Sequence, residues 1–342
     1  MGGRHLSAVG VALSLLLSGC PSSQSDSGIN PNPTNTPIVV TGQTPEQSAS
    51  PTPRVVVDRQ AEREELLREV ASLIEKARED FPGRTAVVFI DFESDKTLDY
   101  EGSEQFESAS LMKLIVIAEL YRLVQVGQLD IDHPLTLEER HIVGGAGDLK
   151  DLEPGTTFSV KVLVEKMITQ SDNTATQMLT DFLTKQALQK SIKNLGLSGT
   201  TVNRDVYDFE AIDRGLDNYI TARDAARLLV QIAKEELPGS KEIHAVLERQ
   251  RRNDMIGHDF PSGTRVAHKT GELTGILHDV GIVYAPKGAF VLALLSDQVR
   301  DRDKGVKVFG CLAYDILKLY QTTSPTPTPS LPTEEGSDVH NR

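Results

Sequence analysis

The chain contains no tryptophan and few aromatic residues of any kind, and it is short of positive charge. Phe, Tyr and Trp together make up 5% of its 342 residues, and the formal net charge is -13 at pH 7. Proteins that bind nucleic acids use basic surfaces and often stack the bases on aromatic rings. The composition therefore argues against a nucleic-acid partner and against electrostatic adhesion to anionic lipid.

Cysteine is also scarce, and the first of the two cysteines ends a distinctive leader. Residues 1–20 carry one charged side chain, and the apolar run at 9–17 is too short to span a bilayer. The run ends in Leu17-Ser18-Gly19-Cys20, which resembles the bacterial lipoprotein processing site. The resemblance implies export and lipidation of Cys20, which would anchor the protein to the bacterial membrane in the cell envelope. The alternative is an ordinary secretory signal with an incidental cysteine.

The second cysteine, Cys311, would be the only thiol left after lipidation of Cys20, so no intrachain disulfide could form. It lies within a helical pattern of apolar residues, and we expect it to be buried. The eight histidines show no metal-binding spacing, and His268 is interpreted as a strand residue. We expect neither a metal nor a cofactor.

After the leader, large apolar residues are rare from residue 21 to about residue 52 and again from residue 322, which predicts a single folded domain between these two segments. Residues 21–57 and 321–342 are rich in Ser, Thr and Pro and are predicted to be a disordered tether and a disordered tail. Residues 58–320 have the periodicity of a globular domain, which we expect to be monomeric. Its Gly-Gly-Ala-Gly run at 144–147 lacks the Lys-Ser/Thr of a phosphate loop and is interpreted as a surface turn near the cleft.

Periodicity within this domain predicts an α+β fold. Strands are expected at 85–91 and 97–100, and later at 266–270, 280–284 and 290–296. Helices are expected around 66–77 and at 110–125, 160–169, 173–182, 185–194, 221–234 and 304–319. This order predicts a five-stranded antiparallel sheet with the first and last helices on one face, together with a helical lobe.

Three polar motifs follow one another along this domain. They are Ser110-x-x-Lys113, Ser171-Asp172-Asn173 and Lys269-Thr270-Gly271. A serine becomes a good nucleophile only when a base takes its proton, and a lysine three residues later lies on the same face of a helix. The first motif alone is a weak signal, but all three in this order are rarely met by chance.

With these motifs, residues 60–320 resemble the class A β-lactamases and the penicillin-binding-protein-like serine hydrolases. The resemblance implies a β-lactamase/transpeptidase-like fold and an acyl-enzyme formed on Ser110. Lys113 would accept or relay the serine proton, and Ser171 would hand a proton to the leaving nitrogen. Asn173 would contact Lys113 and the substrate amide.

The third motif, by the same resemblance, would bind the other end of the substrate. Lys269 and Thr270, with Gly271 beside them, would attract and hydrogen-bond a substrate carboxylate. The backbone N–H groups of Ser110 and Glu272 would form the oxyanion hole. The implied substrate is a β-lactam or a related peptidoglycan-like amide.

The chain departs from the family pattern in the loop between the second and third motifs. Class A β-lactamases use a loop glutamate to activate the water that frees the acyl-enzyme. Alignment from Gly196 to Thr221 places Val206 at that position. Asp208 and Glu210 are candidates for a shifted deacylation base, but most loop acids are merely solvated, which favours a solvated turn or an ion pair with Arg204 or Arg214.

The sequence thus supports three functional hypotheses. The first is a β-lactamase-like hydrolase that degrades β-lactam antibiotics. The second is a D,D-peptidase resembling penicillin-binding proteins, and the third is a β-lactam or cell-wall sensor that stays acylated. The missing in-register glutamate supports the second and third hypotheses.

Overall fold

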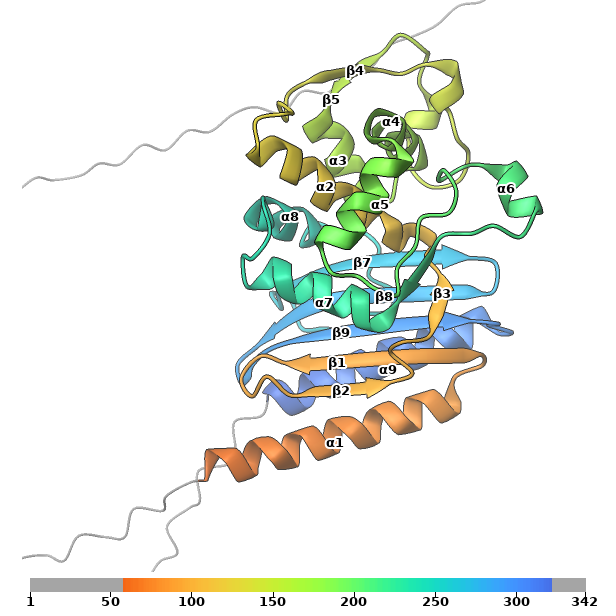
Figure 1. Ribbon diagram of the computed structural model, residues 1–342. Coiled ribbons are helices and arrows are strands. Elements are labelled where there is room, and N and C mark those ends of the chain that lie inside the picture. The colour runs from red at the N-terminus through yellow and green to blue at the C-terminus, as the bar shows by residue number, and fades with distance from the viewer. Residues whose placement is uncertain (1–57, 322–342) are drawn as a thin grey trace, which may run out of the picture. The chain divides into compact units, whose positions relative to one another are not determined.

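The computed structural model describes residues 58–321, which form two layers of helices around one sheet (Figure 1). The predicted leader with Cys20, the tether at 21–57 and the tail beyond Gln321 lie outside the described residues and stay predictions. No helix within residues 58–321 combines the length and the apolarity needed to cross a bilayer.

The sheet has five antiparallel strands, as the sequence predicts. In chain order they are β1 (Arg84–Asp91), β2 (Thr97–Tyr100), β7 (Val266–Leu273), β8 (Ile276–Ala285) and β9 (Gly288–Asp297). Their order across the sheet is β2-β1-β9-β8-β7, so the N-terminal hairpin pairs with the last strand. This topology leaves β7, the strand of the third motif, at a sheet edge.

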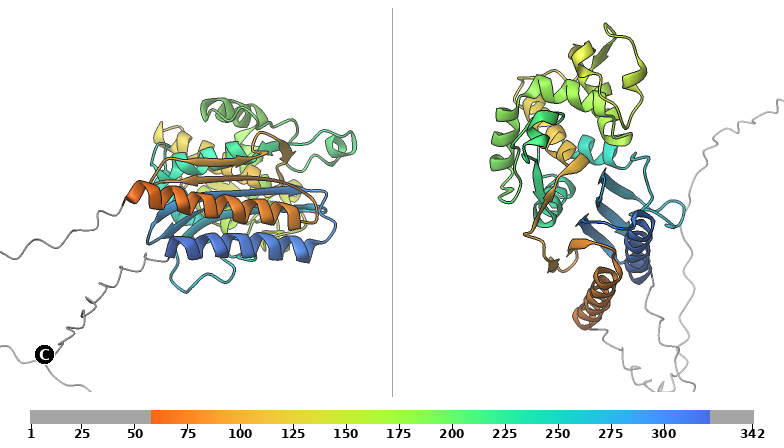
Figure 2. Two further views of the ribbon diagram at one scale, coloured as in Figure 1. Left: turned by 90° about the horizontal axis from the view of Figure 1, so that it is seen from below. Right: turned by 90° about the vertical axis from the view of Figure 1, so that its right-hand side faces the viewer.

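Helices α1 (Arg59–Asp80) and α9 (Arg302–Gln321) cover one face of the sheet, which confirms the expected pairing of the first and last helices (Figure 2). Their apolar stripes pack on strand residues that face the same side. Ile74 of α1 and Ile316 of α9 are fully buried with Phe89 of β1. Burial of a large apolar side chain contributes about 1.5–3 kcal/mol, which accounts for the attachment of both helices.

The predicted burial of Cys311 is wrong, since this thiol is exposed on α9. The buried stripe of α9 contains Phe309, Leu312, Ala313 and Ile316. Cys311 lies just outside this stripe, in a groove between α1 and α9. The apolar periodicity was correct for the helix, but the sequence did not show where the boundary of its buried face falls.

The other face of the sheet supports the helical lobe and carries the site. Helix α2 (Lys113–Gln125) runs through the helical lobe and is buried over its first eight residues, and α7 (Ala222–Ala233) packs on the sheet. The remaining helices are α3 (Val160–Thr169), α4 (Asn173–Leu183), α5 (Lys185–Asn194), α6 (Phe209–Asp213) and α8 (Ser240–Leu247). Helices α3, α4, α5 and α7 match their predicted positions, whereas α6 and α8 were not predicted.

Four short strands were also missed. They form two separate pairs, β3 (Gln105–Glu107) with β6 (Tyr219–Thr221) and β4 (Pro134–Thr136) with β5 (Thr157–Ser159). Each is three residues long, too short for an alternating pattern to be recognised. The β3–β6 pair matters for function because it joins the segment before Ser110 to the end of the loop that contains Val206.

Candidate active site

Ser110 lies on a tight turn that leads into α2. Residues Ala109–Met112 form a 3-10 helix, and α2 begins at Lys113. The helix that was predicted to begin at residue 110 therefore starts as a 3-10 helix and continues as an α-helix. In a 3-10 turn, side chains three residues apart eclipse one another, which places Ser110 and Lys113 on the same side. Ala109 has a φ of 44°, a left-handed conformation that is strained for a residue with a Cβ.

Ser171 lies in the connection between α3 and α4, also with a left-handed backbone (φ 57°). The following Asp172 caps α4, and its carboxylate accepts a hydrogen bond from the Ala175 N–H at 2.7 Å. Two further N–H groups, of Asp148 and Leu149, donate to the same buried carboxylate. Asp172 therefore fixes the turn that presents Ser171 and Asn173 to the cleft.

A continuous chain of hydrogen bonds joins the first two motifs. The Oγ atoms of Ser110 and Ser171 are 3.0 Å apart, and the Lys113 Nζ lies 3.0 Å from Ser171 Oγ. The Lys113 Nζ also contacts the Ser171 carbonyl oxygen at 2.6 Å and the Asn173 Oδ1 at 3.2 Å. The described contacts of Lys113 thus reach Ser110 through Ser171, not directly.

The third motif completes the cluster from the sheet edge. Lys269 projects from β7, and its Nζ lies 3.1 Å from Ser171 Oγ and 2.7 Å from the Thr270 carbonyl oxygen. Gly271 lies against the turn that carries Ser110, where an added Cβ would be 3.4 Å from the Ala109 Cβ. The structure therefore brings together Ser110, Lys113, Ser171, Asn173 and Lys269.

Both lysines are buried, and burial changes their chemistry. Desolvation, followed by the charge of Lys269, lowers the pKa of the Lys113 amine well below its usual value. Desolvation also lowers the pKa of Lys269 to about 7, with the Arg252 charge acting in the same direction and Asp279 opposing it. An amine that is neutral near physiological pH can accept a proton, which an ordinary exposed lysine cannot do.

The glycine-rich run at 144–147 is a surface turn, as predicted, but it also holds the second motif in place. The Asn173 side chain donates to the Gly144 carbonyl at 2.9 Å, and the Asn173 N–H donates to the Ala146 carbonyl. Gly147 packs on Asp172 so closely that a Cβ there would be 2.1 Å from its carboxylate oxygen. Nothing in the spacing of the motifs indicated this contact.

The loop that departs from the family pattern is closed by an ion pair. Arg204 donates to the Asp217 carboxylate at 2.7 Å and to the carbonyl oxygens of Asp205 and Val206. The Asn218 carbonyl then accepts from the Ser108 N–H at 2.7 Å, which joins the loop to the turn that carries Ser110. The loop is thus built as a defined structure around Val206.

The two candidate deacylation bases in this loop have other contacts. Asp208 caps α6, where its side chain accepts from the Ala211 N–H at 2.9 Å. The Glu210 side chain is 92% exposed and lies 4.0 Å from the Arg214 guanidinium. Neither side chain belongs to the hydrogen-bonded cluster around Ser110, so the geometry favours the solvated-loop interpretation.

Sequence reasoning missed Tyr207, the neighbour of Val206. Its phenol hydrogen-bonds Thr176 on α4, and burial raises its pKa because the charged phenolate would lose its water. Tyr207 therefore packs the loop against the helix that follows the second motif. Its position was not evident because the contact joins residues 31 apart in the sequence.

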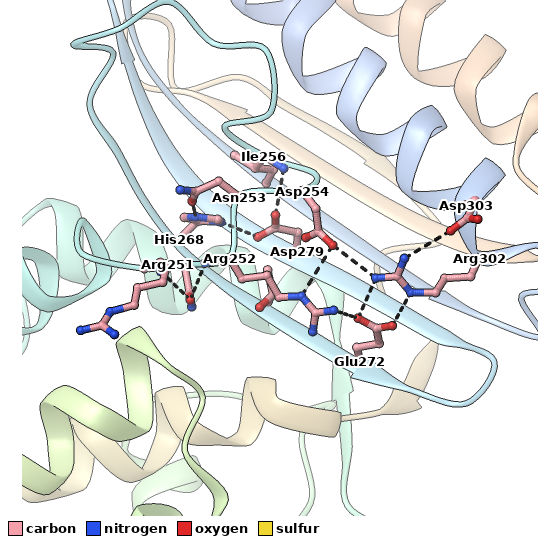
Figure 3. A network of polar contacts seen from close by, with 12 residues as sticks. Arg251, Arg252, Asn253, Asp254, Ile256, His268, Glu272, Asp279, Arg302 and Asp303 are labelled. Atoms are coloured by element: carbon pink, nitrogen blue, oxygen red, sulfur yellow. Dashed lines mark hydrogen bonds and ion pairs between the residues drawn. The ribbon is translucent and has the colours of Figure 1, made fainter. Parts of the chain in front are cut away.

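Glu272 follows the third motif, and its carboxylate is held by two arginines (Figure 3).

His268, four residues earlier on β7, is a buried strand residue, as interpreted from the sequence. Its Nδ1 is 2.9 Å from the Asp279 carboxylate and its Nε2 is 2.7 Å from the Asn253 side-chain oxygen. Among residues 58–321, no group of three His, Cys, Asp or Glu side chains is arranged to hold a metal ion.

Comparison with known proteins agrees with this geometry. The model of the β-lactamase enzyme family matches residues 65–320. A β-lactamase from Bacillus licheniformis is 25% identical over 231 residues, covering 65% of this chain and 74% of that protein. The structure of a β-lactamase from Sphaerobacter thermophilus is 26% identical with a TM-score of 0.65, covering 73% of this chain and 95% of that one. The structure of PBP-A is 25% identical, with a TM-score of 0.65 and coverage of 74% and 95%.

The chain has the fold shared by class A β-lactamases and penicillin-binding-protein-like enzymes, as its motifs predicted. It belongs to the β-lactamase enzyme family.

Proposed function

We propose that this protein is a serine hydrolase that forms an acyl-enzyme on Ser110 with β-lactams or related peptidoglycan-like amides. The observation that carries the proposal is the hydrogen-bonded chain from Ser110 through Ser171 to Lys113, with Lys269 on its other side. Acyl transfer to serine requires a hydroxyl within reach of a base and a route for its proton, and this chain of contacts supplies both.

Acylation begins with transfer of the Ser110 proton. The hydroxyl proton passes to Ser171, whose own proton moves to the neutral Lys113 amine, while Ser110 Oγ bonds to the carbonyl carbon of the substrate amide. The backbone N–H groups of Ser110 and Glu272 stabilise the oxyanion that forms. The carbon–nitrogen bond then breaks, and the proton returns through Ser171 to the leaving nitrogen. The product is an ester between the substrate acyl group and Ser110.

Release of the acyl group distinguishes the three possible roles. A β-lactamase hydrolyses the ester with base-activated water, and general-base help of this kind is worth roughly 10²–10⁴-fold. Val206 cannot act as that base, and Asp208 and Glu210 have contacts elsewhere. These contacts favour slow release, as in a D,D-peptidase or a sensor, and a role for Asp208 or Glu210 requires the loop to move.

The proposed setting of the reaction is the bacterial cell envelope. Lipidation at Cys20 would place the domain at the membrane surface, where peptidoglycan and incoming β-lactams are both encountered. The domain is proposed to act as a monomer and without a cofactor, because its own side chains supply the nucleophile, the proton relay and the cationic group.

The test is covalent labelling with a fluorescent penicillin, followed over time together with product. We expect one label per protein at Ser110, located by peptide mass analysis, and no label in Ser110→Ala. Many product equivalents per protein would indicate a β-lactamase, whereas a persistent label would indicate a peptidase or sensor. Undiminished labelling of Ser110→Ala, or no labelling of the unaltered protein, would contradict the nucleophile assignment.

A further inference from the structure

The residue after the third motif is an acid placed where the proposed function requires attraction for a carboxylate. Successive side chains of a strand point to opposite faces, so Thr270 and Glu272 share one face of β7. The hydroxyl of Thr270 is the group expected to bind the substrate carboxylate. The Glu272 carboxylate therefore lies one pleat further along the same side of the same strand.

The carboxylate of Glu272 is paired with two arginines that come from distant segments of the chain (Figure 3). The Arg252 Nη2 is 2.5 Å from Glu272 Oε2, and Arg302 places its Nε 2.5 Å from Oε1 and its Nη2 3.3 Å from Oε2. Arg252 comes from the segment after α8, and Arg302 is the first residue of α9. Hydrogen bonds between a guanidinium and a carboxylate are charge-assisted and stronger than those between neutral groups, so both arginines are directed at Glu272.

The position of Arg252 follows from its neighbours. The adjacent Asn253 bonds to His268, which lies on the same face of β7 as Thr270 and Glu272. Arg252 and Asn253 therefore bind the two residues that flank Thr270 on this face, Glu272 and His268. The charge of Arg252 also reaches the site lysine, since it helps to lower the pKa of Lys269.

Neither arginine of this cluster lacks a carboxylate partner. Arg252 and Arg302 face the carboxylates of Glu272 and Asp254, whose Oδ2 lies 3.6 Å from Arg252 Nε and 3.3 Å from Arg302 Nη2, and the exposed Asp303 lies 3.4 Å from Arg302 Nη1. Replacing Glu272 with a neutral residue would remove one of three negative charges and leave both guanidinium groups without their nearest carboxylate. The side chain of Glu272 is 22% exposed, so solvent and an incoming anion can approach it.

We propose that Glu272 determines specificity, because its carboxylate occupies the arginine pair that would otherwise attract a substrate carboxylate beside Thr270. This inference rests on the proposed function and adds a substrate preference to it. A ligand with a free carboxylate at this end meets a neutralised arginine pair and the like charge of Glu272. A ligand that is neutral at this end, such as an ester or amide, avoids that repulsion.

The test compares benzylpenicillin with its methyl ester in the unaltered protein and in Glu272→Gln. The substitution removes the charge but keeps the side-chain shape and the backbone N–H of the oxyanion hole. We expect the second-order acylation rate with benzylpenicillin to rise about fivefold, a size typical of one partly exposed charge pair, and the rate with the ester to stay within about twofold. Glu165→Gln is the matched control, since Glu165 binds Arg249 through both oxygens in the helical lobe.

Equal changes for the two ligands, or a selective loss with benzylpenicillin, would contradict the role of Glu272. The same comparison can be made without acylation, by calorimetric measurement of the binding of both ligands to proteins that also carry Ser110→Ala. There Glu272→Gln should raise the affinity for benzylpenicillin relative to that for its methyl ester. Absence of labelling at Ser110 in the unaltered protein would contradict the proposed function instead. An unchanged ratio with normal labelling would contradict only the specificity proposal.

Discussion

At the scale of single residues, the site combines two lysines that lie within hydrogen-bond distance of one hydroxyl. Lys113 and Lys269 are both buried and both contact Ser171 Oγ, at 3.0 and 3.1 Å. Burial disfavours the charged form of each amine, and each charge disfavours the other. The pair therefore makes available a neutral amine that can take the Ser110 proton.

The pH dependence of acylation should report this coupling. Because the pKa of Lys113 is lowered, acylation should rise with pH at a lower pH than a free lysine would require. The charge of Lys269 is one cause of the lowered pKa of Lys113, and Lys269→Gln removes it. The pKa of Lys113 should therefore rise, and the increase in acylation rate with pH should occur at higher pH. The rate itself should fall by roughly tenfold or more, because a charge aimed at the substrate is lost.

The measurement is the second-order rate of labelling by fluorescent penicillin across the neutral and alkaline range. Lys193→Gln, which removes an exposed lysine at the end of α5, is the control for net charge and should leave the profile in place. If the pH at which the acylation rate increases is unchanged or lower in Lys269→Gln, the Lys269 charge does not act on Lys113.

At the scale of elements, strand β8 holds the segment that leads to Ser110. The ring of His278 on β8 is fully buried, and its Nε2 lies 2.9 Å from the Glu107 carbonyl oxygen at the end of β3. Its Nδ1 accepts from the Ser296 N–H of β9 at 3.2 Å. A neutral imidazole thus connects the sheet to the chain three residues before Ser110.

This connection should weaken in acid. Burial lowers the pKa of His278 to about 4, compared with about 6.5 in an unfolded chain. As the pH falls from 6.5 toward 4, the unfolded chain takes up a proton that the folded protein does not, so the free energy of unfolding decreases. The total loss from this group is about 3 kcal/mol.

Urea titrations at a series of pH values would measure the effect. His278→Gln keeps a donor and an acceptor but does not titrate, so its stability should depend less steeply on pH in this window. The exposed His133→Gln should retain the slope of the unaltered protein. Equal slopes in all three proteins would argue against a buried neutral imidazole at position 278.

At the scale of the whole molecule, the two end helices are fastened to the sheet on the face opposite the helical lobe (Figure 2). The buried carboxylate of Asp91, at the end of β1, accepts from Arg63 of α1 and from the Tyr320 hydroxyl of α9 at 2.8 Å. Ser94 donates to the same carboxylate through its N–H and hydroxyl groups. One acid therefore joins both ends of the folded domain.

Removal of the arginine should destabilise the fold without affecting the chemistry. Arg63→Ala leaves a buried carboxylate short of its cation, and we expect a loss of about 3 kcal/mol in the free energy of unfolding. Arg68→Ala removes an exposed arginine of the same helix that pairs with Glu65, and should have little effect on the free energy of unfolding. Urea unfolding measures both.

Acylation rates below the unfolding transition should be equal in these two variants and the unaltered protein, since the network and Ser110 lie on opposite faces of the sheet. A loss in Arg63→Ala no larger than that in Arg68→Ala would show that Tyr320 and Ser94 suffice to stabilise the Asp91 carboxylate. A slower acylation in Arg63→Ala would instead indicate that the two faces are coupled.

The sequence by itself determined the strand and helix order and the three motifs of the site. These features are local: the periods of apolar residues define strands and helices, and motif residues lie within three positions of one another. The fold class, the five strands and the pairing of the end helices followed from them. The exposure of Cys311 could not be predicted in this way, because the spacing of apolar residues along a helix does not show where its buried face ends.

Only the tertiary structure decided how distant segments meet. Ser110, Ser171 and Lys269 come from a 3-10 turn, the connection between α3 and α4, and a sheet edge, and the arginines of Glu272 come from segments 20 and 30 residues away from it. Such contacts depend on the packing of whole elements, which a local pattern does not encode. The sequence indicated a nucleophile and its partners, and the packing determined the relay between them and the neutralised arginine pair beside Thr270.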